Sequence, residues 1–352
     1  MTLTLRTDEV GQRLLLGAGV RHELPAVLDD LGIRRAALMT SSSAAAFANG
    51  LANGLPKAST VALARGHVPA EIVAAALDLV AAHEADGLVS VGGGSATGLA
   101  KAVARRTRLA IVAVPTTLAG SEATPVWGVT EGGHKRTGRD PVVQPRVVLA
   151  DPETLQSVPS AVLGSSGLNA LAHATAAFVG AAPSPLSRLL AADGARRLLA
   201  TLARAAAADI DALAESVYGA QLTARGFALA GGGAHHRMCH ALGGAFGLPH
   251  AATHAVLLPH TVAALPHEPK ASLADAWQVP DVVAAVTSLT RDLETPRTLA
   301  ALGLDDADVE QAVDLCVAAA GPDLAAARVR AAVVDAHTGA APGAGHGQAR
   351  SR

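Results

Sequence analysis

The chain has 352 residues and a formal net charge of −2, and charged residues make up 16% of it. This balance gives no reason to expect binding to nucleic acid or to a membrane surface. Its two cysteines provide neither a disulfide framework nor a CxxC motif, so we expect a cytoplasmic protein. We expect no signal peptide, because residues 1–12 contain no apolar core of that type, and no transmembrane segment, because no uninterrupted apolar run is long enough to span a bilayer.

The first 155 residues alternate between strand patterns and helix patterns. Strands are predicted at 12–19, 35–40, 59–66, 87–91 and 109–115, and helices between them at 23–32, 43–54, 70–85 and 96–106. Strands that alternate with helices of this length indicate βαβ units on a parallel sheet. We therefore predict a Rossmann-like α/β dinucleotide-binding domain over residues 1–155.

The pattern changes after Asp151, where short apolar helical runs follow one another without a convincing strand. This predicts an all-helical substrate domain over residues 156–338. The segment 339–352 is rich in Gly, Ala and Pro, and we expect it to be a flexible tail.

A glycine-rich turn, SVGGGSATGLAK, follows the strand at 87–91. Glycines let a pyrophosphate approach the backbone, and a helix N-terminus attracts its charge. Ser95 is expected to cap the helix that follows. The next strand leads into PTTLAGSE, and ligands bind at the carboxyl ends of such strands. The expected cofactor-binding residues are Gly93, Gly94, Ser95, Thr116, Thr117 and Ser121. A GGGS turn alone is weak support, and the two polar turns together are stronger.

The choice between the two nicotinamide cofactors depends on the end of the strand at 35–40. That strand runs into Thr40 and Ser41, with no acid to take the ribose 2′-hydroxyl. The sequence therefore predicts NADH or NADPH without choosing between them.

Five of the fourteen histidines lie between Gly231 and His254. His236 and His240 stand four residues apart on a predicted helix, so they share one face. Gly247 and Pro249 end that helix, and a new segment carries His250 and His254 at the same spacing. A lone histidine is more often a cap or a core residue. The cluster, with Asn169 and His173 spaced alike upstream, predicts a pocket walled by several helices.

These motifs resemble the group III, iron-dependent type alcohol dehydrogenase superfamily. The resemblance lies in GGGSxxxxAK, PTTxAGSE, the Asp151–Pro152 pair and the ordered set Asn169, His173, His236, His240 and His250. It implies a dehydroquinate synthase-like architecture of an α/β domain and an all-helical domain. It also implies an active site in the cleft between the domains, and a homodimer.

Within that superfamily the chain more closely resembles the maleylacetate reductases. The stretches that carry this are 124–141, 167–174 and 235–260. The resemblance implies NAD(P)H-dependent reduction of the carbon–carbon double bond of maleylacetate to 3-oxoadipate, in the breakdown of aromatic compounds. The substrate would be this small dianionic unsaturated oxo-acid or a closely related one.

The resemblance also bears on the metal of the superfamily, which an Asp and three His hold. The histidines match His173, His236 and His250, whereas Asn169 stands at the Asp position. A neutral amide removes the charge and the hard oxygen ligand on which an iron site relies. We therefore expect no metal, although three histidines can hold zinc. Gly98 likewise stands where the GGGS motif of the superfamily usually has an Asp.

Hydride addition to a double bond conjugated with a ketone leaves an enolate, which must be stabilised and protonated. Histidine suits both tasks, so we expect His173, His236, His240 and His250 to be catalytic. His236 and His240 are equal candidates for the proton donor.

Residues expected to bind the substrate are Asn169, His254, Lys135 and Arg139. Lys135 and Arg139 fall in a predicted loop, where they bind a carboxylate or are simply solvated. His67 is a further candidate, and Cys239 is expected to be a buried small side chain without a role.

Two other functions are compatible with these motifs. One is a metal-dependent alcohol dehydrogenase or carbonyl reductase, which would lose activity to chelators. The other is a catalytically silent binding subunit, which would not bind NAD(P)H.

Overall fold

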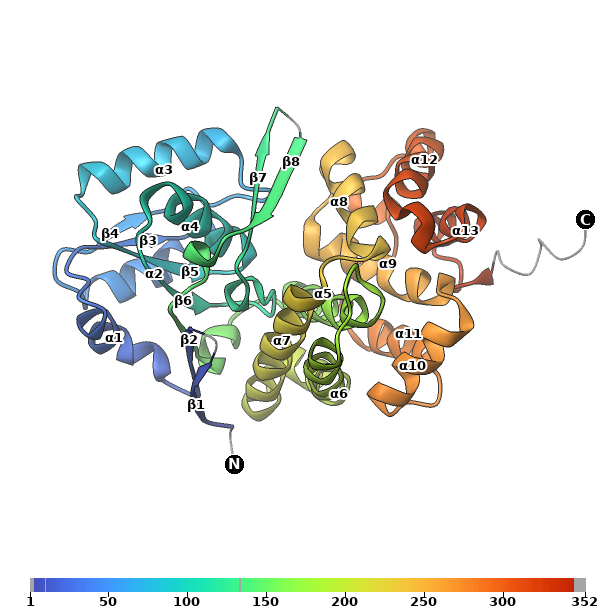
Figure 1. Cartoon of the computed structure of the whole chain (residues 1–352), viewed down its shortest axis with the longest axis horizontal. Helices are drawn as coiled ribbons and strands as arrows, with labels where there is room; N and C mark the ends of the chain where they lie inside the picture. The colour runs from blue at the N-terminus through green and yellow to red at the C-terminus, as the bar shows by residue number, and fades with distance from the viewer. Residues whose placement is uncertain (1–2, 10, 133, 345–352) are drawn as a thin grey trace, which may run out of the picture. The chain divides into compact units, whose positions relative to one another are not determined.

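The computed structural model describes residues 3–9, 11–132 and 134–344. The chain divides into two compact units, which Figure 1 colours from blue to green and from yellow-green to red. The N-terminal unit comprises Met1–Val158 with Asp209–Val217, and the C-terminal unit comprises Pro159–Ala208 with Tyr218–Arg352.

A seven-stranded sheet forms the centre of the N-terminal unit, in the order β1-β2-β9-β6-β5-β3-β4. Its strands are β1 (Leu5–Glu9), β2 (Gln12–Leu16), β3 (Ala36–Met39), β4 (Ser59–Val61), β5 (Gly87–Gly92), β6 (Ile111–Pro115) and β9 (Val147–Ala150). Every neighbouring pair is parallel except β1 with β2, which is antiparallel. The predicted parallel sheet is therefore confirmed. The sequence analysis missed the polar edge strand β1 and the four-residue strand β9.

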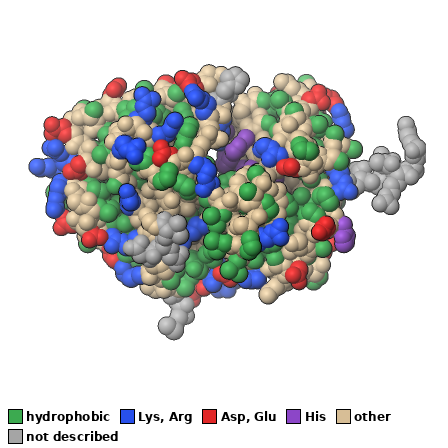
Figure 2. Space-filling view, in the orientation of Figure 1, with side chains coloured by type: hydrophobic (Ala, Val, Ile, Leu, Met, Phe, Trp, Pro, Cys, Tyr) green, Lys and Arg blue, Asp and Glu red, His purple; other side chains and the backbone are tan. Residues whose placement is uncertain are grey.

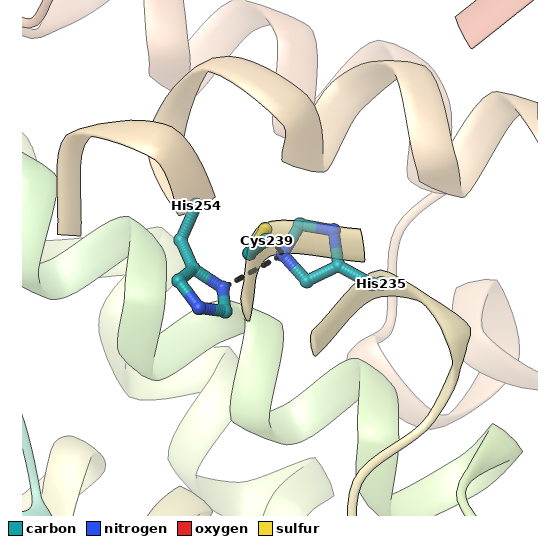
Figure 3. Close-up of side chains that lie close together, drawn as sticks. All are labelled: His235, Cys239 and His254. Atoms are coloured by element: carbon teal, nitrogen blue, oxygen red, sulfur yellow. Dashed lines mark hydrogen bonds between the residues drawn. The ribbon is translucent and has the colours of Figure 1, made fainter. Parts of the chain in front are cut away.

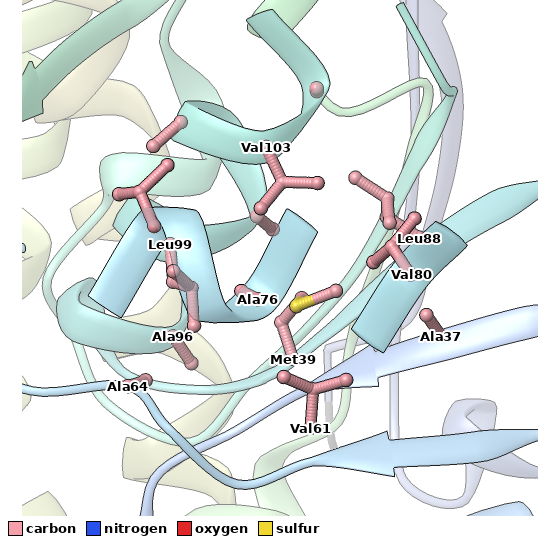
Figure 4. Packing of buried hydrophobic residues seen from close by; sticks show 14 of the residues in the cluster. Ala37, Met39, Val61, Ala64, Ala76, Val80, Leu88, Ala96, Leu99 and Val103 are labelled. Carbon is pink, nitrogen blue, oxygen red and sulfur yellow. The ribbon is translucent and has the colours of Figure 1, made fainter. Parts of the chain in front are cut away.

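Helices cover both faces of the sheet: α1 (Leu24–Asp30), α2 (Ala45–Ala52), α3 (Ala70–Ala82) and α4 (Gly94–Thr107). Side chains of a strand alternate between faces, so Leu88 packs in one core cluster and Val89 in the other. The cluster under α3 and α4 includes Met39, Leu99 and Val103 (Figure 4). A sheet buried on both faces explains why these strands are continuous apolar runs instead of alternating ones.

A two-stranded hairpin follows the sheet strands, formed by β7 (Val126–Glu131) and β8 (His134–Arg139). It corrects the prediction that Lys135 and Arg139 lie in a loop, since both are in β8. Gly132, with φ of +55°, allows the tight turn between Glu131 and His134, which pair across the hairpin. The turn signal GG was visible in the sequence, but Lys, Arg and Gly concealed the strand on its far side.

The C-terminal unit is all-helical within the described residues, as predicted. Its helices are α5 (Ser160–Val179), α6 (Pro185–Ala206), α7 (Ile210–Ala230, whose first residues group with the other unit), α8 (Ala234–Phe246), α9 (His250–Ala264), α10 (His267–Trp277), α11 (Val282–Asp292), α12 (Val309–Ala320) and α13 (Ala326–Thr338). Short 3-10 helices connect elements in both units: Val20–Glu23, Ser42–Ala44, Ser121–Ala123, Pro141–Val143, Pro152–Leu155, Ala300–Leu302, Asp306–Asp308 and Gly321–Asp323.

Helix α5 is the core of the C-terminal unit, and it packs against α6, α8, α9 and α10. Small residues allow this close packing: a Cβ on Gly167 would lie 2.3 Å from Leu202. By length and composition α5 is the one helix among the described residues that qualifies as a membrane span, which the sequence analysis did not anticipate. Because 89% of its most apolar window is buried, we describe α5 as a core helix.

The surface in the view of Figure 2 carries Lys and Arg interspersed with Asp and Glu, in keeping with a formal net charge of −2. No large area of this face has a single sign of charge. The charge pattern of this face therefore provides no electrostatic platform for a polyanion.

Candidate functional site

The glycine turn of the N-terminal unit joins β5 directly to α4. Gly92 has φ of +141°, a conformation that side chains rarely adopt, and Gly93 is the N-cap of α4. Ser95 lies inside the first turn of the helix, and the N-cap, Gly93, has no side chain that could cap it. The prediction that Ser95 caps the helix is therefore wrong, because the helix begins one residue before it. The first backbone N–H groups of a helix have no intrahelical acceptor, which suits an anion.

The second polar turn lies against this one. The backbone N–H of Thr116 donates to the Gly92 carbonyl over 3.1 Å. Thr117 packs so closely that a Cβ on Gly93 would lie 2.8 Å from its Oγ1. Thus the structure brings Gly93, Gly94, Thr116 and Thr117 together at the carboxyl ends of β5 and β6. Their role in binding a cofactor stays a prediction.

Lys101 is the last residue of the motif GGGSxxxxAK, and the sequence analysis assigned it no role. It holds the chain after the second turn. It is 0% exposed, and its Nζ donates to the carbonyls of Ser121 (2.5 Å), Thr124 (2.8 Å) and Val126 (2.9 Å). Burial lowers the pKa of Lys101 to about 7, and Glu122 nearby opposes the shift. Ser121 therefore serves as a backbone acceptor for Lys101. The signal for this role was its position as a single lysine among the apolar residues of α4.

Gly98 departs from the superfamily motif for a steric reason. A Cβ at this position would lie 2.7 Å from Cγ2 of Val68. Val68 and its neighbour His67 both have positive φ, at +50° and +62°. Thr130 of β7 holds this bend, since its Oγ1 donates to the His67 carbonyl over 2.8 Å. The space of the usual Asp side chain is occupied here by Val68.

The predicted histidine pocket forms within the C-terminal unit. Asn169 and His173 lie on α5, His236 and His240 on α8, and His250 begins α9, which also carries His254. Ring centroids are 5.1 Å apart for His173 and His236, 4.6 Å for His236 and His254, 4.5 Å for His254 and His250, and 5.6 Å for His250 and His240. The rings therefore form one continuous cluster from three helices.

Phe227 of α7 completes one wall of this cluster. Its ring centroid lies 4.8 Å from that of His173 and 4.6 Å from that of His236. The sequence analysis missed this residue, because a single Phe in an apolar helix carries no signal of function. The ring limits the space in which a ligand of the two imidazoles would fit.

Several polar atoms of the pocket are buried and have no hydrogen-bond partner among the described residues. They are Oδ1 of Asn169, Nδ1 of His173, both ring nitrogens of His236 and Nε2 of His254. Buried polar groups in native proteins are nearly always hydrogen-bonded. A cluster of such atoms in one pocket therefore indicates a site that a polar ligand fills.

Burial also determines the charge of these histidines. Desolvation lowers the pKa of His173 to about 4 and that of His235 to about 3, and it lowers the pKa of His236 and of His254 well below the usual range. The four rings are neutral near pH 7. Each then offers one N–H and one lone pair.

Figure 3 shows His235 and Cys239 beside His254, with the rings of His235 and His254 pointing toward each other. Nε2 of His235 is 2.9 Å from Nδ1 of His254 and 3.7 Å from Sγ of Cys239. Nδ1 of His235 is 2.8 Å from Oγ1 of Thr261 on α9. Burial raises the pKa of the Cys239 thiol well above its usual value, so the sulfur stays protonated. The absence of a role for Cys239 remains our expectation.

Lys135 and Arg139 belong to the N-terminal unit. They lie four residues apart in β8, so their side chains are on the same face of the hairpin. Lys135 is half-buried and Arg139 is exposed. Burial lowers the pKa of Lys135. Binding of a substrate carboxylate by either residue stays a prediction.

The chain is similar to known proteins over most of its length. Residues 11–152 match the sequence model described as iron-containing alcohol dehydrogenase, and residues 164–334 match that of the C-terminal part of the same family. The maleylacetate reductase of Burkholderia cepacia is 38% identical over 312 residues, which cover 87% of this chain and 89% of that protein.

Solved structures agree with this comparison. The crystal structure of maleylacetate reductase from Agrobacterium tumefaciens aligns with a TM-score of 0.85 at 36% identity, covering 97% of this chain and 100% of that one. The iron-containing alcohol dehydrogenase from Corynebacterium glutamicum aligns with a TM-score of 0.88 at 33% identity, covering 97% and 99%. The resemblance seen in the sequence is confirmed.

The iron in the family description counts against our expectation that the chain binds no metal. The residues at the family's ligand positions nevertheless fit iron poorly, because Asn169 contributes a neutral, unpartnered amide oxygen where a carboxylate is needed. In the described part of the chain, ligand atoms lie within 4.8 Å of one another for His240, His250 and His254, and for His235, Cys239 and His254. Neither group contains His173 or His236.

Proposed function

Because the chain belongs to the iron-containing alcohol dehydrogenase family, we propose that it is an NAD(P)H-dependent oxidoreductase that reduces the carbon–carbon double bond of maleylacetate to 3-oxoadipate. The observation that carries this proposal is the pocket of neutral histidines with unpartnered buried nitrogens. Its support is the likeness to maleylacetate reductases over most of the chain. The pathway would be the breakdown of aromatic compounds.

The N-terminal unit supplies the cofactor side of the reaction. We assign the pyrophosphate to the N-terminus of α4, over Gly93, Gly94 and Ser95, with Thr116 and Thr117 beside it. The end of β3 supports no choice between NADH and NADPH, because Thr40 and Ser41 follow it without an acid. Binding here orients the nicotinamide, which supplies the hydride.

The histidine pocket supplies the substrate side. Hydride from the bound nicotinamide would form a new C–H bond at the carbon β to the ketone. The π electrons of the carbon–carbon double bond would then shift toward the ketone and leave an enolate with its negative charge on the ketone oxygen. A neutral imidazole N–H stabilises such an oxyanion, as a preorganised donor in a buried site. His173 and His236 suit this task, because burial keeps both rings neutral.

The second step returns the electron pair to carbon and adds a proton there. His240 is half-buried, whereas burial lowers the pKa of His236 well below its usual range. We therefore favour His240 as the proton donor, with His250 beside it at a ring separation of 5.6 Å. Overall one hydride and one proton add across the double bond.

The substrate carboxylates need donors that do not depend on a metal. The amide of Asn169 offers two N–H donors inside the pocket. Lys135 and Arg139 offer cationic donors, and Arg has the planar fork that fits a carboxylate. A site with these groups would act without a divalent ion, which is part of this proposal.

Location and assembly belong to the same proposal. Cys239 and Cys316 are both buried free thiols, which suits the reducing cytoplasm. We place the enzyme there, as a homodimer like those implied by the family. Light scattering with size-exclusion chromatography at several protein concentrations measures the mass that tests the dimer.

Steady-state oxidation of NADH and of NADPH with maleylacetate tests the function directly. We expect saturable turnover, with 3-oxoadipate as the product by mass spectrometry. The matched comparison uses small aldehydes and ketones with the same enzyme and cofactors. Turnover of these carbonyl compounds, with none of maleylacetate, would replace this proposal by carbonyl reduction.

A further inference from the structure

A chain of buried hydrogen bonds ends on His254, one of the pocket histidines. It runs from Thr261 through His235 to His254, at 2.8 Å and 2.9 Å. All three residues are buried, with His254 at 0% exposure. Because the chain connects an α9 hydroxyl to a ring in the pocket, the direction of its protons decides what His254 offers to a ligand.

The direction follows from the hydroxyl at the far end. Oγ1 of Thr261 donates to the carbonyls of Leu257 and Leu258, each 3.1 Å away. A hydroxyl has one proton, so its oxygen is left as an acceptor for Nδ1–H of His235. A neutral His235 protonated at Nδ1 has its lone pair on Nε2. That lone pair accepts Nδ1–H of His254 over 2.9 Å.

The thiol of Cys239 agrees with this direction. Burial keeps it protonated, and its Sγ lies 3.7 Å from Nε2 of His235. A lone pair at Nε2 accepts a weak hydrogen bond from the S–H group. A proton at Nε2 would instead point toward the S–H proton. The single lone pair at Nε2 of His235 therefore faces Nδ1–H of His254 and, at the longer distance, the S–H of Cys239.

We propose that Thr261 and His235 are positioning residues that hold His254 in its Nδ1-protonated form, with the Nε2 lone pair facing the histidine pocket. Nε2 of His254 is buried and has no partner among the described residues. This revises its expected role, since an acceptor repels a substrate carboxylate. His254 is instead the acceptor for an N–H of the neighbouring imidazoles.

The pocket histidines beside His254 on α8 and α9 are His240 and His250. Ligand atoms of these two rings and of His254 lie within 4.8 Å of one another, a separation that one water molecule or a small ring rotation bridges. A protonated histidine that transfers the proton of one ring nitrogen to carbon still carries an N–H on its other ring nitrogen. The lone pair of His254 accepts a hydrogen bond from this second N–H, and so orients the ring of the proton donor.

This role rests on the proposed function, but its first test does not. In protein labelled with ¹⁵N-histidine, two-bond ¹H–¹⁵N correlation spectra near pH 7.5 distinguish protonated from bare ring nitrogens. The His235 and His254 signals are assigned by their loss in His235→Gln and His254→Gln. We expect both wild-type rings to be protonated at Nδ1. Protonation of His254 at Nε2 overturns the proposal, whatever the substrate is.

Thr261→Val and Thr261→Ser form the matched pair for the second test. The valine removes the acceptor and retains the shape, and the serine keeps the hydroxyl. We expect kcat with maleylacetate to fall about tenfold or more in Thr261→Val, with KM within about twofold. Thr261→Ser should retain a kcat close to that of the wild type, because the hydroxyl is still present. Thr290→Val on α11 is the control. The hydroxyl of Thr290, like that of Thr261, donates to a carbonyl of its own helix, in this case that of Val286.

The outcomes separate the two proposals. If wild-type enzyme does not reduce maleylacetate, the proposed function fails while the NMR result still decides the tautomer. If wild type is active and folded Thr261→Val keeps wild-type kcat, the positioning role is wrong and the function stands. An equal loss in Thr261→Ser would likewise contradict it, because the hydroxyl is present there.

Discussion

Thr117 packs where a side chain on Gly93 would have to be, since a Cβ there would lie 2.8 Å from Thr117 Oγ1. The close contact between the two turns therefore requires a glycine at position 93, whatever ligand binds there. Gly94 is different: a Cβ on it would meet only Ala119, at an ordinary 3.6 Å. A substitution at Gly94 therefore tests the ligand without first disturbing the fold.

We predict that Gly94→Val blocks the approach of the pyrophosphate to the backbone. Affinity for NAD(P)H, measured by fluorescence titration, should fall about tenfold or more, a loss of at least about 1.4 kcal/mol. Gly50→Val in α2 is the control, because a Cβ on Gly50 meets nothing within 4 Å. Unchanged affinity in folded Gly94→Val would refute the assigned cofactor position.

We predict that His240→Asn lowers kcat about a hundred- to ten-thousand-fold, the usual worth of a general acid. His173→Asn and His236→Asn should also lower kcat, because they stabilise the enolate. Asn169→Ala should mainly raise KM, since it removes a binding contact. Circular dichroism checks that each variant is folded. Folded variants that all retain wild-type kcat/KM would make these pocket residues structural.

We predict that activity survives exhaustive chelation, because Asn169 lacks the charge of a ligand carboxylate. Elemental analysis alongside the NADH oxidation assay measures this. Asn169→Asp should bind divalent ions more tightly than wild type by isothermal titration calorimetry, since it restores that charge. Wild-type activity that disappears with EDTA and returns with a divalent ion would overturn the prediction.

We predict that the protein loses stability in mild acid. Burial lowers the pKa of His173 to about 4, of His235 to about 3 and of His260 to about 4. The unfolded chain binds protons at about pH 6.5 while these folded rings do not, so stability is complete above that pH and falls below it. Each ring then costs about 2 kcal/mol by pH 5.

Urea unfolding at several pH values between 7.5 and 5 measures this loss. His260→Gln removes one of these three rings. The unfolding free energy of the variant should therefore fall less steeply than that of the wild type as the pH decreases, and the two slopes should differ by about 1.4 kcal/mol per pH unit. Equal slopes in the two proteins would show that His260 is protonated in the folded state.

We predict that Lys101→Met destabilises the N-terminal unit by about 3 to 5 kcal/mol. It leaves three buried carbonyls, of Ser121, Thr124 and Val126, without their donor. Lys57→Met, on the exposed surface, is the control and should change stability little. A loss no larger than in the control would mean that these carbonyls find other partners.

Much of the fold was determined by patterns that act over a few residues. Apolar runs of five or six residues produced β5 and β6, and four-residue spacing placed His236 with His240 on one helical face. These signals are local, because a strand or helix face depends on near neighbours in the chain. The sequence also indicated the pocket, since Asn169 and His173 repeat the spacing of the later pairs.

Only the tertiary structure decided which of these residues meet and what each one offers. Val68 occupies the place of a side chain on Gly98 from thirty residues away in sequence, a contact that no local pattern encodes. The same holds for His254, which the sequence analysis expected to bind the substrate. Its proton is set by His235 and Thr261, because a neutral ring has one N–H and its partner decides which nitrogen carries it.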